Sequence, residues 1–287
     1  MNILVSGSNG QLGNELRVLS ESYPQYNFIF TDIEELDITS IEKVDHFFTD
    51  KSIDVIINAA AYTAVDKAES EKESAMLVNS TAVKILAEAS VKFDAFFIHI
   101  STDYVFDGNG QNPYKETDAV NPQSVYGSTK LEGEKEMQRI CTKGIMIRTS
   151  WLYSTFGNNF VKTILRVGKE RGNLNVVNDQ SGSPTYAADL AKAVLDIIPQ
   201  INTIDKVELL HYSDEGNITW FDFAKAIIEI SGISCNVNPV TSSEFPTPVK
   251  RPAYSVLDKS KIREMFAVEV PFWKDSLKIC LAKLLAK

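Results

Sequence analysis

The stretch ILVSGSNGQLG, residues 3–13, joins a short apolar run directly to a glycine-rich loop. Gly7, Gly10 and Gly13 give the pattern Gly-x-x-Gly-x-x-Gly between a predicted buried strand and a predicted helix. Glycines at these positions allow a tight turn and let the backbone approach a pyrophosphate, which rests at the positive end of the helix. The stretch therefore predicts a dinucleotide-binding strand–loop–helix unit.

The same alternation of strand and helix continues through the first half of the chain. Short apolar runs predict buried strands, and apolar residues at helical spacing lie between them. Such alternation is typical of a parallel sheet with helices on both faces, so we predict a doubly wound α/β fold. The predicted strands are residues 3–5, 28–30, 55–57, 96–100 and 145–147, and the helical spacings cover residues 12–19, 41–48 and 69–92.

The pattern loosens after about Trp151, where loops rich in Asn, Ser, Pro and Gly separate helix-like segments. We expect a dinucleotide-binding domain over residues 1–150. Residues 151–287 are expected to form mainly a smaller, mixed substrate-binding domain, with segments that return to the first domain. The helix-like segments are residues 160–168, 187–198, 220–230 and 271–285.

Charge and composition narrow the function classes. The chain has 287 residues, 44% of them hydrophobic, and a formal net charge of −9. Such an acidic chain repels phosphates, which argues against nucleic acid and anionic membranes as partners. No run approaches the roughly 20 apolar residues of a membrane span, and the three cysteines show no metal or disulfide spacing. The cytoplasm is the expected location.

Asp32 follows the second predicted strand, about 20 residues after the glycine loop, where an acidic residue reads a ribose hydroxyl. A carboxylate there favours NAD, because it would repel the additional phosphate of NADP. Alternatively, Asp32 could be a turn residue with no contact to a cofactor. After the third strand, residues 58–63 (NAAAYT) are mostly small, which leaves room for a cofactor over the strand end or simply for close packing.

Tyr126 and Lys130 are four residues apart, so on a helix their side chains share one face. Alone, this spacing is equally typical of a solvated helix turn. Together with the glycine loop and the hydroxyl of Thr102 at a strand end, it resembles the extended class of short-chain dehydrogenases/reductases. The resemblance implies that Thr102, Tyr126 and Lys130 are the catalytic residues.

Within that class the chain is similar to the dTDP-4-dehydrorhamnose reductase family, in matching order over nearly its whole length. The similarity implies reduction of the C4 ketone of a dTDP-sugar, dTDP-4-dehydrorhamnose, to dTDP-L-rhamnose, with NADPH or NADH as hydride donor. The segments that carry it are residues 10–13, 58–69 (NAAAYTAVDKAE), 101–107 (STDYVFD), 125–130, 148–152 (RTSWL), 157–160, 178–185 (NDQSGSPT) and 251–252.

The resemblance also assigns residues to the two ligands. The cofactor residues it implies, added to Gly7, Gly10, Gly13 and Asp32, are Gln11, Leu12, Asp37, Ile38, Ala61, Tyr62 and Thr63, with Tyr126 and Lys130. The substrate residues are Thr102, Asp103 and Trp151, joined by Val65, Asp66, Asn158 and Arg251.

Some members of the family bind Mg²⁺ through glutamates at a dimer interface. Glu15 matches the first of these glutamates, but Ala188 and Lys283 stand where the others would be. We therefore predict no metal ligands and no Mg²⁺-bridged dimer, while a homodimer of another kind stays open.

The chemistry of a ketone reduction needs a hydride donor and a proton for the developing alkoxide. Tyr126 would give the proton, and Lys130 would supply the positive charge that makes a phenol with a pKa near 10 effective. Two alternatives share the fold: a sugar-nucleotide epimerase or dehydratase that retains its NAD, and a non-catalytic regulatory subunit. Whether NADH or NADPH is preferred stays open.

Neighbouring residues have plainer interpretations. Trp151 could pack in the core instead of contacting substrate, and Arg251 could be a surface charge. His99, in the middle of an apolar run, is interpreted as a packed, hydrogen-bonded core histidine. The charged run at residues 130–136 is typical of a solvated helix face.

Overall fold

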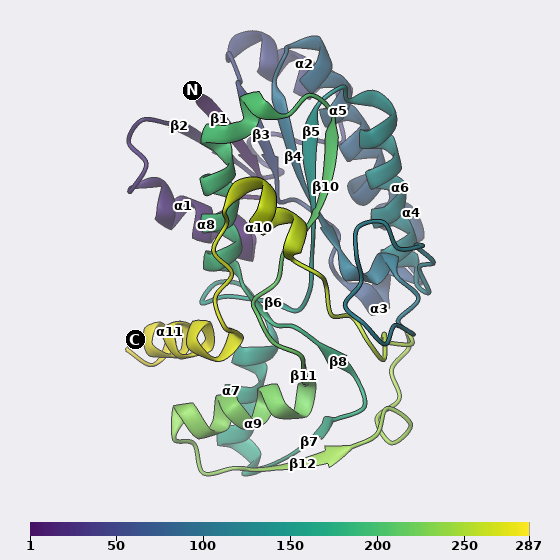
Figure 1. Ribbon diagram of the computed structural model, residues 1–287, viewed down its shortest axis with the longest axis vertical. Coiled ribbons are helices and arrows are strands. Elements are labelled where there is room, and N and C mark those ends of the chain that lie inside the picture. The colour runs from purple at the N-terminus through teal and green to yellow at the C-terminus, as the bar shows by residue number, and fades with distance from the viewer. Residues whose placement is uncertain (287) are drawn as a thin grey trace.

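The computed structural model describes residues 1–286. At its centre lies a six-stranded sheet in the order β10-β5-β4-β3-β1-β2, with every pair parallel (Figure 1). This confirms the predicted doubly wound α/β fold, in which the strand order reverses between β1 and β3. The strands are β1 (Asn2–Ser6), β2 (Asn27–Thr31), β3 (Val55–Asn58), β4 (Phe96–Thr102), β5 (Gly144–Thr149) and β10 (Val207–His211).

Helices cover both faces of this sheet, because successive strand residues point to opposite sides. In β1, Ile3 and Val5 join one apolar core, and Leu4 joins the other. The first face is covered by α1 (Gln11–Ser20) and α8 (Ala187–Ile197), and the second by α2 (Ile41–Asp50), α5 (Ala82–Lys92) and α6 (Val125–Ile140) (Figure 1).

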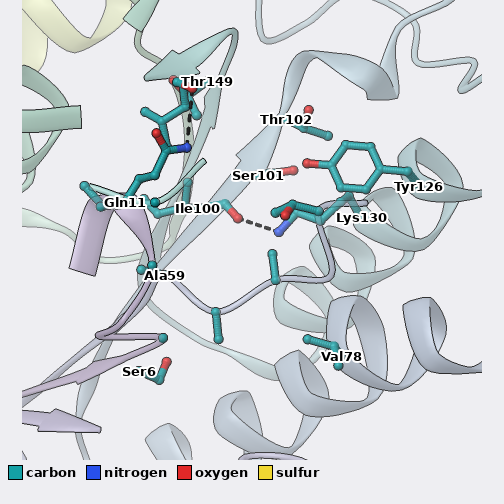
Figure 2. A pocket seen from close by; sticks show the side chains of 18 of the residues that line it. Ser6, Gln11, Ala59, Val78, Ile100, Ser101, Thr102, Tyr126, Lys130 and Thr149 are labelled. Atoms are coloured by element: carbon teal, nitrogen blue, oxygen red, sulfur yellow. Dashed lines mark hydrogen bonds between the residues drawn. The ribbon is translucent and has the colours of Figure 1, made fainter. Parts of the chain in front are cut away.

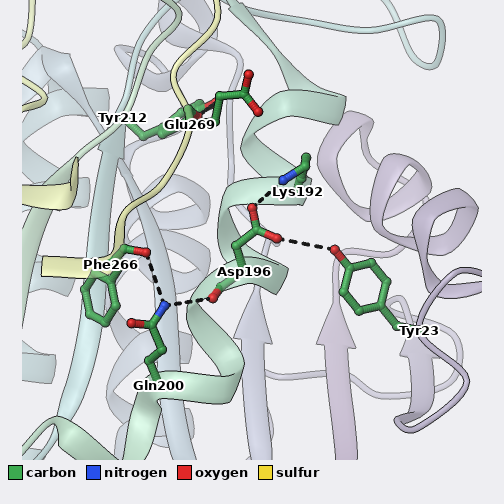
Figure 3. Close-up of polar contacts among 7 residues, drawn as sticks. All are labelled: Tyr23, Lys192, Asp196, Gln200, Tyr212, Phe266 and Glu269. Atoms are coloured by element: carbon green, nitrogen blue, oxygen red, sulfur yellow. Dashed lines mark hydrogen bonds and ion pairs between the residues drawn. The ribbon is translucent and has the colours of Figure 1, made fainter. Parts of the chain in front are cut away.

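Polar contacts tie α8 to segments distant in sequence (Figure 3). Asp196 accepts hydrogen bonds from Tyr23, just after α1, at 3.4 Å and from Lys192 at 2.6 Å. Gln200, in the 3₁₀ helix η3 (Ile198–Thr203), donates to the carbonyl oxygens of Asp196 and Phe266, both at 3.2 Å. These bonds join the N-terminal helix, α8 and α10 (Ser260–Phe266) on one face of the sheet.

The helical spacing at residues 69–92 corresponds to several elements. After α3 (Val65–Ala68) come α4 (Lys72–Met76), the π-helical turn η1 (Leu77–Thr81) and α5. The wide turn carries the buried Asn79, whose Nδ2 donates to the Tyr62 carbonyl oxygen and to Thr129 Oγ1, each at 3.1 Å. Asn79 thereby connects the loop after β3 to α6.

A further apolar core, separate from the two on the faces of the sheet, is formed by residues after 151, whose helices lie below the sheet in Figure 1. Its helices are α7 (Phe160–Arg171), α9 (Trp220–Ser231) and α11 (Trp273–Leu285), each near a predicted helical segment. No helix among residues 1–286 is long and apolar enough to cross a membrane. The short strands beside this core are β6 (Leu152–Tyr153), β7 (Asn173–Val177), β8 (Ser181–Gly182), β9 (Thr185–Tyr186), β11 (Ile218–Thr219) and β12 (Asn236–Val240).

The chain crosses between these two regions more than once. It leaves the sheet after β5, returns as α8 and β10, and leaves again for α9. The division into residues 1–150 and 151–287 stays a prediction.

Candidate active site

A cleft of ≈ 810 Å³ opens at the carboxyl ends of the parallel strands. It lies at the switch point between β1 and β3, where open α/β sheets bind ligands, and its volume is in the range of roughly 300–1,000 Å³ typical of small-molecule sites. Most of the residues predicted from sequence line it: Gly7, Gly10, Gln11, Leu12, Asp32, Asp37, Ile38, Ala61, Thr63, Val65, Thr102, Asp103, Tyr126, Lys130, Trp151 and Asn158.

The glycine loop leaves no room for side chains. Gly7 has φ +72°, and a Cβ added there would lie 2.5 Å from the backbone nitrogen of Ala60. A Cβ on Gly13 would lie 2.4 Å from the carbonyl oxygen of Gly7. Gly7 and Gly10 therefore form a bare backbone cradle at the start of α1, which suits a pyrophosphate, while Gly13 serves close helix–strand packing.

We predict that Gly7→Ala destabilises the fold more than Gly232→Ala does. Gly232 also has a left-handed φ, +69°, but has nothing within 4 Å of an added Cβ. The shared φ costs about 1–2 kcal/mol, and overpacking at Gly7 should add about 1–3 kcal/mol. Urea denaturation of both variants measures the difference. Equal losses would show that the loop can move aside.

Asp32 is held at the end of β2 by two backbone donors. Its Oδ2 accepts from the Asn9 amide at 3.0 Å, and its Oδ1 accepts from the Ile33 amide at 2.9 Å. The carboxylate thus lies against the glycine loop and on the cleft wall. This position is the one where a ribose hydroxyl would be read.

Helix α6 places Tyr126 and Lys130 in its first turns. The helix begins after Ser124, whose Oγ accepts a hydrogen bond from the Gly127 amide at 3.1 Å, a normal N-cap. Tyr126 and Lys130 both extend from α6 toward the cleft beside Thr102, with Gln11 and Ala59 across from them (Figure 2). The three predicted catalytic residues therefore meet at the same cleft as the glycine loop.

Tyr126 is partly buried among the site residues. Burial raises the pKa of Tyr126, the nearby Asp103 and Tyr104 raise it further, and a hydrogen bond with Thr102 opposes the rise. Thr102 Oγ1 itself donates to Asp103 Oδ1 at 3.0 Å. A phenol kept protonated in this way can act as an acid, which is the form that reduction of a ketone requires.

Lys130 is only 2% exposed and has unusual surroundings for a lysine. Its Nζ donates to the Ile100 carbonyl oxygen at 2.6 Å and lies 3.4 Å from His99 Nε2. Burial lowers the pKa of Lys130 to about 8, and the negative charge of Glu134, one turn along α6, opposes this. Lys130 is thus close to the boundary between ammonium and amine near neutral pH.

The interpretation of residues 130–136 as a solvated face is wrong at Glu134. This carboxylate is 4% exposed and accepts from Arg148 Nε at 2.9 Å, from Arg148 Nη2 at 2.6 Å and from Ser101 Oγ at 2.5 Å. Alternating charges in the sequence gave no sign that this position faces β4 and β5. The buried ion pair between Glu134 and Arg148 lies close to Lys130, because Glu134 is one turn further along α6.

Asp103 opens the short 3₁₀ helix η2 (Asp103–Val105) and lines the cleft. Burial raises the pKa of Asp103 to about 6, although the Thr102 hydroxyl donates to it. The Ser255 hydroxyl also interacts with this carboxyl group and opposes the rise in its pKa. A buried carboxyl group on the cleft wall suits a hydroxyl-bearing ligand that would donate a further hydrogen bond to it.

Trp151 lies on the other side of the cleft in a strained conformation. Its φ is +46°, which is rare for a bulky residue and often marks a functional site. The indole stacks on Trp220 with ring centroids 3.6 Å apart. The stack fixes a flat apolar wall on which a sugar or base could rest.

Comparison with known proteins identifies the family. A family model described as RmlD substrate binding domain matches residues 1–286. The chain belongs to this family. Among curated relatives, the dTDP-4-dehydrorhamnose reductase of Escherichia coli (strain K12) is 44% identical over 296 residues, covering 99% of this chain and 98% of the relative.

Solved structures agree with this assignment to the RmlD family. The dTDP-4-dehydrorhamnose reductase from Clostridium acetobutylicum superposes with a TM-score of 0.94 at 43% identity, over 99% of this chain and all of the other. The Bacillus anthracis reductase, solved in complex with NADP, gives 0.92 at 38% identity, over 98% and 99% of the two chains.

In this RmlD-family chain, some predicted ligand residues do not line the cleft. Tyr62 turns its hydroxyl to Glu71 at 2.7 Å, and Gly13 packs inside the loop. Asp66 and Arg251 form an ion pair at 2.5 Å, and Arg251 contacts Tyr104, which lines the cleft. Their roles toward cofactor and substrate stay predictions.

Glu15 and Lys283, two of the positions compared above with the magnesium-binding glutamates of some family members, make other contacts here. Glu15 is buried and accepts from Ser154 at 2.6 Å, while Lys283 donates to the Tyr186 hydroxyl at 3.3 Å. Within residues 1–286 no three His, Cys, Asp or Glu side chains come together as a metal site.

Proposed function

We propose that this chain reduces the C4 ketone of dTDP-4-dehydrorhamnose to dTDP-L-rhamnose, with NADPH or NADH as hydride donor. The observation that carries the proposal is the meeting of Thr102, Tyr126 and Lys130 with the glycine loop at one cleft. Membership of the RmlD family over residues 1–286 supports the same substrate class.

The residues present fit a dinucleotide. Gly7 and Gly10 leave backbone exposed where a pyrophosphate would lie, Asp32 faces the place of a ribose, and Ala59 to Ala61 leave the end of β3 open. When bound, the reduced nicotinamide supplies the hydride. Gln11, Leu12, Asp37, Ile38 and Thr63 would line the rest of its path.

The chain's own groups would handle the proton and the orientation of the sugar. Tyr126 would donate its phenolic proton to the ketone oxygen as that oxygen becomes an alkoxide, and Thr102 would hydrogen-bond the same oxygen. Lys130 would stabilise the phenolate left behind. Asp103 and Trp151, with Val65 and Asn158, would hold the sugar nucleotide so that the reacting atoms stay aligned.

A spectrophotometric assay tests the function and decides among the alternatives. The chain is mixed with dTDP-4-dehydrorhamnose and either NADPH or NADH, and the absorbance of the reduced nicotinamide is followed. We expect a substrate-dependent loss of absorbance and formation of dTDP-L-rhamnose. An epimerase or dehydratase that retains its NAD would convert the sugar with no net loss of absorbance, and a regulatory subunit would do neither.

Comparing the two cofactors in this assay also ranks them. Asp32 favours NADH, because its carboxylate would repel a 2′-phosphate, yet the Bacillus anthracis relative was solved with NADP. The ratio of kcat/KM values for NADPH and NADH measures how well the site accommodates a 2′-phosphate beside the Asp32 carboxylate.

The net charge of the chain and its proposed substrate also bear on its cellular location and its binding partners. We propose that the chain acts in the cytoplasm and that its net charge of −9 keeps it off nucleic acid. A homodimer, if formed, would assemble without a metal bridge, because Ala188 and Lys283 offer no carboxylate beside Glu15.

A further inference from the structure

A row of polar side chains crosses the sheet behind Lys130. The strand register pairs Ser6 of β1 with Asn58 of β3, and Asn58 with His99 of β4. Laterally paired residues of a sheet point to the same face, so these three side chains are neighbours. All are buried, and Asn58 and His99 are fully so.

The backbone fixes the orientation of the Asn58 amide. Asn58 Oδ1 accepts from the Ala60 amide at 3.1 Å and from Ser6 Oγ at 2.9 Å. The Ala60 N–H can only donate, so the oxygen of Asn58 must face it. The Nδ2 group of Asn58 then faces His99 Nδ1, at 3.2 Å.

The orientation of Asn58 decides which nitrogen of His99 carries the proton. Because Asn58 Nδ2 is a donor, His99 Nδ1 must accept, and a neutral imidazole then bears its proton on Nε2. Burial and the charge of Lys130 hold the pKa of His99 well below its usual range, so the ring is neutral. The Nε2–H therefore faces Lys130 Nζ at 3.4 Å.

A neutral amine at Lys130 can accept from this N–H and donate to the Ile100 carbonyl oxygen. An ammonium would place two donors against each other. We propose that Asn58 and His99 are positioning residues that fix the hydrogen-bond partner of Lys130, so that Lys130 loses its proton more easily than a lysine facing only oxygen acceptors.

This inference rests on the proposed function only in taking Lys130 as part of the catalytic machinery. The charged and titratable groups around Lys130 are His99 from β4, Glu134 and Tyr126 from α6, Arg148 from β5 and Asp103 from η2. Glu134 favours the ammonium but is itself paired with Arg148. The histidine is the one neighbour among them whose proton position is set by another side chain.

Nuclear magnetic resonance of the wild-type chain, labelled with ¹⁵N, tests the proton position directly. The chain has three histidines, of which His46 is exposed. His211 Nδ1 lies 3.0 Å from the Tyr114 carbonyl oxygen, so that ring must carry its proton on Nδ1, and burial lowers its pKa to about 3. We expect two non-titrating rings, one protonated on Nε2 and one on Nδ1. Two rings protonated on Nδ1 would overturn the proposal.

Two variants test the effect on Lys130. Asn58→Asp keeps an acceptor for Ala60 but accepts from His99 Nδ1–H, which moves the imidazole proton away from Lys130. Asn58→Leu frees the ring without adding charge. In both, we expect the basic limb of kcat/KM to move up by about one pH unit. A shift in Asn58→Asp alone would mean that charge, and not the proton position, sets the limb, and would refute the proposal.

The two kinds of measurement separate this inference from the proposed function. The ring protonation of His99 does not depend on substrate, so an inactive chain with the expected spectrum would remove the reductase proposal and leave the proton position established. If both Asn58 variants fail to fold, the wild-type spectrum still decides.

Discussion

Tyr126→Phe is expected to lower kcat at least about 100-fold while cofactor affinity stays within about twofold. Loss of a general acid typically costs 10²–10⁴ in rate. The ring and its edge-to-face contact with Tyr104, at 5.5 Å between centroids, are retained by phenylalanine. Only the hydroxyl is lost, and it is the group that Thr102 contacts. Steady-state kinetics and fluorescence titration with NADPH measure the two effects.

Tyr23→Phe is the matched control for Tyr126→Phe. Its hydroxyl bonds to Asp196 at 3.4 Å (Figure 3), and neither residue lines the cleft. This control should keep the wild-type rate. A Tyr126→Phe variant with near-normal turnover would exclude Tyr126 as the proton donor and direct attention to Thr102 and Asp103.

Arg148→Met is expected to lower the free energy of unfolding by about 3–5 kcal/mol. Arg148 and Glu134 side chains are 3% and 5% exposed, so the guanidinium is the main counter-charge of a carboxylate that has left water. After the substitution Glu134 keeps only the Ser101 hydroxyl as donor. Urea denaturation with a two-state fit measures the loss.

The exposed pair Arg166–Glu170 provides the comparison. Its side chains are 64% and 53% exposed, so Arg166→Met should cost less than about 1 kcal/mol. The double variant Arg148→Met with Glu134→Leu should recover part of the loss, because no unpaired charge is left buried. Similar losses in Arg148→Met and Arg166→Met would mean that water reaches Glu134.

The strands that could be predicted from sequence are those built on short apolar runs. Four runs are uninterrupted, at residues 3–5, 28–30, 55–57 and 145–147, and the run at residues 96–100 is broken at His99. All five lie in strands of the sheet. Strand β10 was missed because Glu208 interrupts its apolar pattern, and this carboxylate is tolerated through its 2.7 Å ion pair with Lys261. Strands β7 and β12 were also missed, because asparagines and Pro239 interrupt their apolar patterns. These two strands pair with each other although they are far apart in sequence.

The meeting of Thr102, Tyr126 and Lys130 at one cleft could be predicted because their relationship is local. Helical spacing alone places Tyr126 and Lys130 together, and a strand end positions Thr102. His99 was correctly interpreted as buried and hydrogen-bonded, but its contact with Lys130 was missed. That contact depends on the register of β3 against β4 and on the packing of α6, neither of which any short pattern specifies.

Strand β10 joins the sheet late in the sequence, so one edge of β5 stays unpaired during much of the synthesis of the chain. Strand β5 is buried along its whole length, and its outer edge pairs only with β10, whose last residue is His211. Until then a nascent chain presents an apolar strand edge open to pairing with a neighbour. Protection of that edge by a chaperone, or a fast docking of α8, would therefore decide the yield of native protein.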